Sequence, residues 1–407
     1  MQTESLSLHP VHPFPARMAP SIVQRRLGAT NRPISVLDPM SGSGTTIVAA
    51  RLCGHRAIGF DTDPLAILIA ETWSSDIDPA RLRIEARRAL TDAADRYHYL
   101  TQSEAYPADA DDETRAFVRF WFDGMNRRQL AALSIAISQV KNPIDRNSLW
   151  CAFSRLIITK QAGASLAMDV SHSRPHKVYD IAPVKPLKGF LHAVDAVLKG
   201  SPFSNGPEFP KATVRRADAR KLPLGDETVD LVITSPPYLN AIDYLRGHKF
   251  SLVWMGYKLG QIRGLRSENV GTERSLRSPV NDEHVRIAMK EMGDTGKLSE
   301  RLRGMLARYV CDMNLVLAEI SRVLRPRAET VLVVGDSTIR GVFVQNSRAL
   351  THLSRANGLT PVSTCRRPLL ENRRYLPPPQ KTMAGDQLGG RMREEVILTF
   401  RKSYSTA

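Results

Sequence analysis

Hydrophobic positions near the start of the chain fall into two short apolar runs separated by small and glycine residues. The first run is Ile34, Val36 and Leu37, and the second is Ala57 to Phe60. Between them lie a glycine-rich turn and a small-residue segment from Thr45 to Cys53. Short apolar runs bounded by turn residues are typical of buried parallel strands, so this order predicts strand, turn, helix and strand.

Five further strands are predicted later in the chain, at Val214–Arg216, Val229–Ile233, Thr330–Val334, Thr360–Ser363 and Glu395–Phe400. A helix is expected before the third of them, because Leu315, Val316, Ile320, Val323 and Leu324 recur at helical spacing and Pro326 follows. Strands that alternate with helices predict an α/β fold built on a doubly wound, Rossmann-like sheet.

The segment from Pro79 to about Lys211 is too long for a connecting loop and carries helical periodicity over residues 113–140. Trp121 and Phe122 are expected to pack inward there. We therefore predict a helical insertion at 80–211, a possible DNA-contacting subdomain, between two parts of one domain at 1–79 and 212–407. The polar stretch Gly163–Val178 is interpreted as a solvated or DNA-facing loop, since its His172 and His176 lack partners at metal-ligand spacing.

Charge changes this picture by suggesting a partner. Lys and Arg number 57 against 41 Asp and Glu, which gives a formal charge of +16 and a pI near 9.9. Such an excess is typical of proteins that bind polyanions, although a basic protein with no such partner is the alternative. No apolar run is long enough for a membrane span and no signal peptide is evident, so we expect a cytoplasmic protein without membrane contact. The four cysteines are far apart, which argues against a zinc site or a disulfide framework.

The glycine-rich turn "DPMSGSGTT", from Asp38 to Thr46, has the features of a nucleoside site. Its glycines permit a tight turn and a close ligand, and Asp61 ends the second strand where a carboxylate could accept from ribose hydroxyls. A phosphate-binding loop is the competing interpretation, but the lysine that it requires is absent. The turn therefore suits a cofactor without a pyrophosphate.

A second motif, "TSPPY" from Thr234 to Tyr238, follows the predicted strand at Val229–Ile233. Two prolines donate no backbone hydrogen bonds, so they end the strand and stiffen the loop after it. Open α/β sheets place their chemistry at such strand ends. The alternative is a Pro-Pro turn with a packed tyrosine.

Together the two motifs resemble those of S-adenosylmethionine-dependent DNA amino-methyltransferases. "HPFPARMAP" (His12 to Pro20) and "RRADARKLP" (Arg215 to Pro223) are similar to further cofactor segments of the same enzymes. The resemblance implies a mostly parallel sheet with an antiparallel last strand, and S-adenosylmethionine as cofactor. It implies these cofactor-binding residues: Phe14, Asp38, Pro39, Gly42, Ser43, Gly44, Thr45, Asp61 for the ribose and Asp218 for the adenine amine.

The resemblance also assigns catalysis to Ser235, Pro236, Pro237 and Tyr238. An exocyclic base amine is a poor nucleophile, and the Ser235 hydroxyl with the Pro236 carbonyl could draw its hydrogens out of the ring plane. Tyr238 would stack on a base flipped out of the duplex. Serine in the first motif position favours cytosine N4, with adenine N6 as the alternative. No cysteine follows a proline, so cytosine C5 chemistry is not favoured.

Other functions stay open at this stage. An RNA base methyltransferase has a similar layout, but those enzymes carry an RNA-binding module ahead of the cofactor motif, which here begins near the first residue. A cofactor-binding protein that recognises DNA without catalysis is a third possibility. Duplex DNA is the expected partner, and a cognate restriction endonuclease is a second candidate.

Two basic segments are candidates for DNA contact. Gly256–Val280 is rich in Arg and Gly with little periodicity and is interpreted as a loop that orders on nucleic acid. Cys365–Lys381 joins four arginines to a tyrosine and a proline run. The arginines proposed to contact DNA are Arg263, Arg266, Arg366, Arg367, Arg373 and Arg374.

Overall fold

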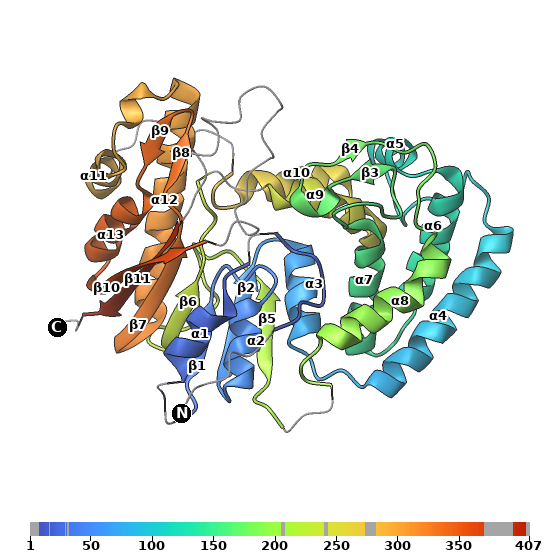
Figure 1. The fold of residues 1–407 in the computed structure, drawn as a ribbon, viewed down its shortest axis with the longest axis horizontal. Helices are drawn as coiled ribbons and strands as arrows, with labels where there is room; N and C mark the ends of the chain where they lie inside the picture. The colour runs from blue at the N-terminus through green and yellow to red at the C-terminus, as the bar shows by residue number, and fades with distance from the viewer. Residues whose placement is uncertain are drawn as a thin grey trace.

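A seven-stranded sheet forms the centre of the computed structural model, which describes residues 8–15, 17–28, 30, 32–204, 208–239, 243–272, 282–369 and 394–403. The strands are β1 (Ser35–Asp38), β2 (Arg56–Asp61), β5 (Ala212–Arg216), β6 (Val229–Thr234), β7 (Leu324–Val334), β10 (Leu359–Pro368) and β11 (Glu394–Lys402). They lie in the order β10-β11-β7-β6-β1-β2-β5 (Figure 1).

Five neighbouring strands of the sheet are parallel to one another: β5, β2, β1, β6 and β7. The strand β11 is antiparallel to both of its neighbours, β7 and β10. Numbered along the chain, the sheet strands follow the order 3-2-1-4-5-7-6. Successive strands are therefore added outward on one side of β1 and then on its other side, as in doubly wound folds. The predicted Rossmann-like sheet with an antiparallel last strand is confirmed.

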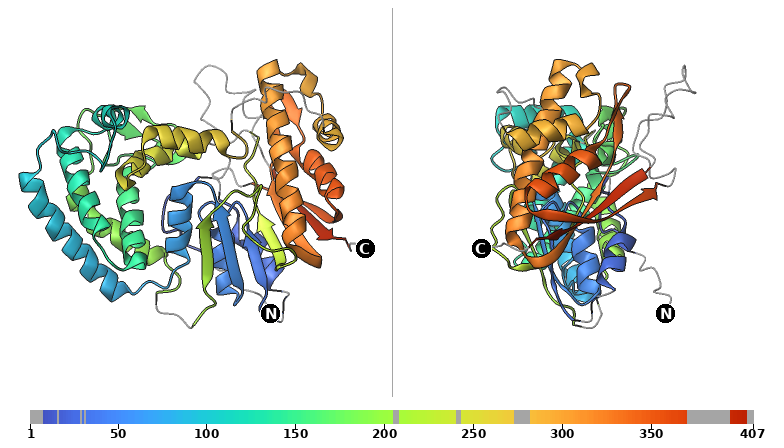
Figure 2. Two further views of the ribbon diagram at one scale, coloured as in Figure 1. Left: turned by 180° about the vertical axis from the view of Figure 1, so that it is seen from behind. Right: turned by 90° about the vertical axis from the view of Figure 1, so that its left-hand side faces the viewer.

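Helices cover both faces of this sheet because successive strand residues point to opposite sides. One face, which includes Leu231 and Ile233, packs on α1 (Pro20–Leu27) and α2 (Thr45–Leu52). The other face, which includes Val232 and Leu332, packs on α12 (Glu300–Val323) and α13 (Asn346–Ala356). Figure 2 shows these two helical layers from behind and from the side.

The insertion is helical as predicted and lies beyond the β5 edge of the sheet (Figure 1). Its helices are α4 (Pro79–Tyr99), α5 (Asp112–Trp121), α6 (Gly124–Ser138), α7 (Pro143–Ile157) and α8 (Pro186–Gly200), with a small ribbon of β3 (Ala167–Met168) and β4 (His176–Lys177). Asp78, Asp111, Asp123 and Asn142 cap the first four, each accepting from backbone N–H groups of the first turn. The insertion core continues into α3 (Pro64–Trp73), and the Trp73 indole donates to the Gly200 carbonyl at 3.1 Å.

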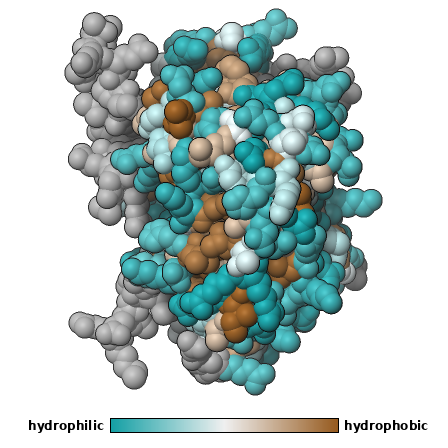
Figure 3. All heavy atoms as spheres, turned by 90° about the vertical axis from the view of Figure 1, so that its right-hand side faces the viewer, coloured by the Kyte–Doolittle hydropathy of each residue, from teal (hydrophilic) through white to brown (hydrophobic). Residues whose placement is uncertain are grey.

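The remaining elements lie at the carboxyl side of the parallel strands. They are α9 (Tyr244–Leu252), α10 (Leu259–Glu268), α11 (Glu283–Glu291), β8 (Ser337–Ile339) and β9 (Val342–Val344). No helix in the described part of the chain has both the length and the apolar character that crossing a membrane requires. Apolar side chains form only small groups on the mainly hydrophilic face in Figure 3.

Two predictions about local structure were wrong. Residues Leu259–Glu268, expected within a loop, form α10, whose Ile262 is buried against the insertion core. Gly163 to Ser171, expected to be solvated, is largely buried because it packs beneath α5 and α7. The helix predicted before the Thr330–Val334 strand is confirmed by α12, which ends at Val323, and Leu324 begins β7; Leu315 on this helix is 52% exposed.

Gly44 illustrates how tightly the first turn is built. It precedes α2 with φ +90°, and a Cβ at this position would lie 2.9 Å from the Cβ of Ala70 on α3. Gly54, after α2, has a similar φ of +78°, but apart from its chain neighbours no heavy atom of the described residues lies within 4 Å of the corresponding Cβ position. An alanine at Gly54 would therefore introduce backbone strain alone, whereas an alanine at Gly44 would introduce backbone strain and a close contact with α3.

We predict that Gly54→Ala lowers the free energy of unfolding by about 1–2 kcal/mol, the usual cost of a left-handed residue. Gly44→Ala should cost about 1–3 kcal/mol more, because the added methyl also overpacks the contact between α2 and α3. Urea titration of both variants and the wild type measures this. Equal losses would show that α3 yields to the methyl and that the turn is not closely packed.

Candidate active site

A direct hydrogen bond joins the two sequence motifs. The Thr234 hydroxyl at the end of β6 donates to Asp38 Oδ1 at the end of β1, at 2.7 Å. Thr46 Oγ1, at the start of α2, donates to the Ile233 carbonyl at 3.3 Å. Because β1 and β6 are neighbouring parallel strands, their carboxyl ends bring the glycine turn and the proline loop to one edge of the sheet.

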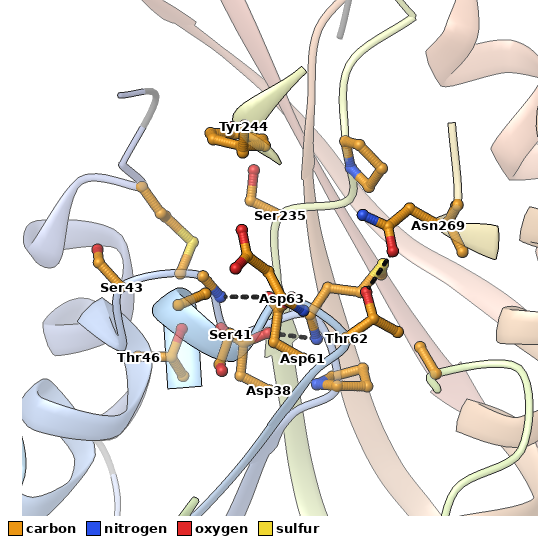
Figure 4. A pocket seen from close by; sticks show the side chains of 18 of the residues that line it. Asp38, Ser41, Ser43, Thr46, Asp61, Thr62, Asp63, Ser235, Tyr244 and Asn269 are labelled. Carbon is orange, nitrogen blue, oxygen red and sulfur yellow. Dashed lines mark hydrogen bonds between the residues drawn. The ribbon is translucent and has the colours of Figure 1, made fainter. Parts of the chain in front are cut away.

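A single cavity opens at this edge and collects most of the predicted site residues (Figure 4). It is lined by Phe14, Asp38, Pro39, Gly42, Ser43, Thr45, Asp61, Asp218, Ser235 and Pro237. Gly44, Pro236 and Tyr238 are not among the lining residues: Gly44 packs on α3, the Pro236 ring is buried, and Tyr238 contacts β11.

Asp61 combines with the glycine turn to form one wall of the cavity. Its Oδ2 accepts from the Gly42 N–H at 2.9 Å, and its Oδ1 accepts from the Asp63 N–H at 3.0 Å. A carboxylate has about four acceptor positions, so the two oxygens keep capacity for two more donors. Gly42 has φ +49°, and a Cβ at this position would lie 3.4 Å from the Phe14 ring. The turn and the carboxylate together can accept a diol close to the backbone.

The electrostatics of the cavity floor are set by two acids, of which Asp38 is buried and Asp61 is half-buried. Burial raises the pKa of Asp38 to about 6, although hydrogen bonds from the Thr234 hydroxyl and the Met40 N–H oppose this shift. Burial also raises the pKa of Asp61 to about 6, with a further contribution from the charges of Asp63 and Asp38. Both carboxylates are therefore ionised at neutral pH but close to their protonation range.

The proline loop carries a serine whose hydrogen is already engaged. Ser235 Oγ donates to the Val333 carbonyl on β7 at 3.0 Å, which leaves the lone pairs of the hydroxyl oxygen available to accept. In Figure 4, Ser235 lies between Tyr244 and the carboxylates of the cavity wall. Ser235 can thus act as a hydrogen-bond acceptor inside the cavity.

The N-terminal segment closes the cavity through stacked rings. Phe14 stacks on Tyr244 of α9 with ring centroids 5.2 Å apart and lies against His248 at 5.4 Å. His248 Nδ1 is 2.5 Å from Asp63 Oδ2, while Asp63 Oδ1 caps α3. These contacts connect the N-terminal segment and α9 to Asp63, which follows β2 beside the glycine turn.

His12 fixes the same segment to the insertion. Its Nε2 is 2.8 Å from Ser154 Oγ on α7 and its Nδ1 is 2.7 Å from the Pro13 carbonyl. Burial, together with the charge of Arg155, lowers the pKa of His12 to about 3, so the imidazole is neutral at physiological pH. The neutral ring can donate at one nitrogen and accept at the other, as these two contacts require.

Asp218 lines the cavity but is also held by a neighbouring arginine. Arg220 donates to both of its oxygens, at 2.7–3.1 Å, and also to Asp312 on α12 at 2.7 Å. Burial alone would raise the pKa of Asp218, but the hydrogen bonds and charge of Arg220 lower it below its ordinary value. Asp218 is therefore an ionised acceptor, oriented by Arg220.

The arginines predicted to contact DNA have different surroundings. Arg263 forms two hydrogen bonds with Glu113, Arg266 pairs with Asp243 at 2.6 Å, and Arg367 pairs with Glu395 at 2.5 Å. Arg366 is 55% exposed and pairs with Glu394 at 3.4 Å. Arg373 and Arg374 lie outside the described residues.

Several cavity residues were not predicted from the sequence. Asn269 and Val270 line the cavity from the segment after α10, and Asn269 Oδ1 accepts from Thr62 at 2.8 Å. Nothing in the sequence around Asn269 indicated this role. Ser41, Thr46 and Asp63 also line it, and their position inside or beside the glycine turn was a usable signal. Within the described ranges, no group of three or more His, Cys, Asp or Glu side chains could hold a metal ion.

Comparisons with known proteins agree with this geometry. No family model matches the chain. Over 380 residues it is 23% identical to the Type II methyltransferase M.MvaI of Kocuria varians, covering 85% of this chain and 80% of the relative. It is also 21% identical over 388 residues to the Type II methyltransferase M.BsoBI of Geobacillus stearothermophilus, covering 81% and 73%. The chain is thus similar over most of its length to two Type II methyltransferases.

A solved structure can be compared as well. A SAM-dependent methyltransferase from Methanosarcina mazei is 9% identical and aligns over 93% of this chain and 96% of its own, with a TM-score of 0.36. A score of this size adds nothing to the fold assignment, which follows from the strand order.

The raised pKa of Asp38 gives a prediction for stability. A carboxyl whose pKa is higher in the folded state binds its proton more tightly there, so stability falls as pH rises from about 4 through about 6. Asp38→Asn removes this titration and keeps an acceptor at Oδ1, where Thr234 and Met40 donate. The wild type should therefore lose about 3 kcal/mol relative to Asp38→Asn between pH 4 and pH 7.

Urea unfolding of both proteins at matched pH values measures this difference. Titrating groups that do not interact with Asp38 cancel in the comparison, whereas the pKa of Asp61 loses the smaller contribution of the Asp38 charge. A difference that stays constant with pH, or that moves in favour of the wild type as pH rises, would contradict the buried carboxyl described above.

Proposed function

We propose that the chain is an S-adenosylmethionine-dependent DNA methyltransferase that methylates the exocyclic amine of a flipped-out base, with cytosine N4 as the favoured target. The observation that carries the proposal is the shared cavity of the two motifs, joined by the Thr234–Asp38 hydrogen bond. Similarity to two Type II methyltransferases supports the same reaction class.

The residues present fit a nucleoside cofactor with no phosphate. Asp61 has acceptor capacity for two ribose hydroxyls, and Asp218, oriented by Arg220, can accept from an adenine amine. The backbone at Gly42 and Ser43 would line the methionine end together with Asp38, Pro39 and Thr45. When bound, S-adenosylmethionine supplies an electrophilic methyl group on a positively charged sulfur, which the two acids on the cavity floor would favour.

The proline loop would prepare the amine. Its nitrogen lone pair is delocalised into the base ring, and acceptors placed outside the ring plane make it more tetrahedral. Ser235 is suited to this task because its own hydrogen is donated to Val333, so its oxygen can only accept from the amine. Pro236 would offer its carbonyl as a second acceptor, and Pro237 lines the cavity beside them. Tyr238 would stack on the extruded base.

The target base is inferred from the first residue of the loop. A serine at position 235 is neutral and accepts from an amine without adding charge beside the base, and the resemblance associates it with cytosine N4. Adenine N6 is the second candidate, since its amine has the same electronic character and could occupy the same acceptor set.

Duplex DNA is the proposed partner. The formal charge of +16 supplies a favourable field for phosphates. Among the predicted arginines, Arg263 and Arg366 have the most exposed side chains of the described ones, at 62% and 55%. Both of them, and Arg266, would exchange a carboxylate for a phosphate on binding, whereas Arg367 is less exposed and is held by the buried Glu395. We assign the insertion, residues 80–211, to DNA contact, with Arg373 and Arg374 as further candidates.

Mass spectrometry of nucleosides from DNA of cells that express the protein tests the proposal. We expect N4-methylcytosine, and at least a hundredfold less of it from Ser235→Ala, because a lost acceptor that acts in the transition state costs about two orders of magnitude. Thr228→Ala is the matched control, since its exposed hydroxyl also donates to a backbone carbonyl, that of Gly225, and it lies outside both the cavity and the insertion.

Detection of N6-methyladenine in place of N4-methylcytosine would move the target to the second candidate. Modified RNA with unmodified DNA, or a full yield from Ser235→Ala, would overturn the proposal.

A further inference from the structure

Glu395, at the start of β11, connects the proline loop to the neighbouring strands. Its Oε1 accepts from the Tyr238 hydroxyl at 3.1 Å. Its Oε2 accepts from Arg367 Nε at 3.1 Å and Nη2 at 2.5 Å. The two oxygens of one carboxylate therefore serve two different donors, and the residue is only 5% exposed.

The sheet register explains why Glu395 reaches the active site. Arg367 on β10 lies directly opposite Glu395 on β11. The next residue, Val396, pairs with Val334, the last residue of β7, so Glu395 lies just past the carboxyl end of β7. The Val333 carbonyl on the same strand accepts from Ser235. β7 thus holds the first residue of the loop and β11 holds the last.

Little conformational freedom remains in a loop held in this way. Pro236 and Pro237 fix their own φ angles, and the Ser235 hydroxyl is engaged by β7. The orientation of the Tyr238 ring is then the main remaining variable, and the hydrogen bond from its hydroxyl to Glu395 restricts it. A buried carboxylate is costly without a partner, and Arg367 supplies one.

A second glutamate on this sheet provides a comparison. Glu329 on β7 lies opposite Arg401 on β11, with the two side chains 2.8 Å apart. This pair is also a cross-strand ion pair, but Glu329 is 24% exposed and lies five residues before the end of β7, toward the opposite edge of the sheet. Its second partner is Arg26, on α1.

We propose that Glu395 is a positioning residue that orients the Tyr238 ring for the extruded base and, through Arg367, connects the β10–β11 hairpin to the base-binding loop. The proposal rests on the proposed function, because it assumes that Tyr238 stacks on a base. Glu395 touches neither substrate nor cofactor and acts through the tyrosine.

Steady-state methylation of host genomic DNA with radiolabelled S-adenosylmethionine tests this role. Glu395→Ala should lower kcat about tenfold, the usual effect of losing one hydrogen bond to a charged group, and leave the KM for S-adenosylmethionine unchanged. Glu395→Gln should have an activity between those of Glu395→Ala and the wild type, because its amide oxygen can still accept from the tyrosine while its amide nitrogen cannot accept from Arg367. Glu329→Ala, the matched control, should behave as the wild type.

A double-mutant cycle separates positioning from general stability. Tyr238→Phe removes the same hydrogen bond from the other side, so Tyr238→Phe combined with Glu395→Ala should be no slower than the slower single variant. Multiplying effects, or equal losses in Glu395→Ala and Glu329→Ala, would overturn the proposal. If Glu395→Ala does not fold, Tyr238→Phe alone decides, and an unchanged kcat in that variant would also overturn it.

The methylation assay distinguishes failure of the proposed function from failure of the Glu395 role. A wild-type protein that does not methylate DNA contradicts the proposed function. A wild-type protein that methylates DNA, with variants at Glu395 and Tyr238 as active as it is, contradicts only the role of Glu395.

Discussion

The buried hydrogen bond from Thr234 to Asp38 is the contact on which the candidate active site depends. It joins residues 196 positions apart in the sequence and closes the gap between β1 and β6 at their carboxyl ends. Two parallel strands can be neighbours only if a long crossover separates them, and here that crossover contains α2, β2, the insertion and β5. The insertion can therefore be large without disturbing the alignment of the two motifs.

Other segments reach this edge through fewer but equally specific contacts. The N-terminal segment is held there by the stacking of Phe14 on Tyr244, and the β10–β11 hairpin by the hydrogen bond from Tyr238 to Glu395. The same carboxylates that favour a cationic sulfur are destabilised by burial, since the pKa values of Asp38 and Asp61 both rise to about 6. Stability is thus reduced where the proposed chemistry needs charge, as is common in functional sites.

The sequence predicted the sheet and most of the cavity because both depend on local signals. Short apolar runs, the glycine turn and the paired prolines each specify their own backbone, and parallel neighbours then bring their ends together. The helix at Leu259–Glu268 was missed because glycines and arginines hid its single buried position, Ile262. Asn269 and the partner of Tyr238, Glu395, were missed because such contacts depend on tertiary register, which a single sequence does not contain. Gly44 belongs to the glycine motif, but it packs on α3 and does not line the cavity. The sequence alone cannot show this, because it depends on where Ala70 lies in the fold.

The central claim is that a methyl donor in the cavity faces the Ser235 acceptor. A crystal structure with S-adenosylhomocysteine bound tests it most directly. The account predicts the ribose hydroxyls on Asp61 and a distance of about 6 Å between the ligand sulfur and Ser235 Oγ, which leaves room for one amine nitrogen in line. A ligand outside this cavity, or a sulfur that points away from Ser235 at more than about 10 Å, would contradict the account, because no amine held by the loop could then be reached.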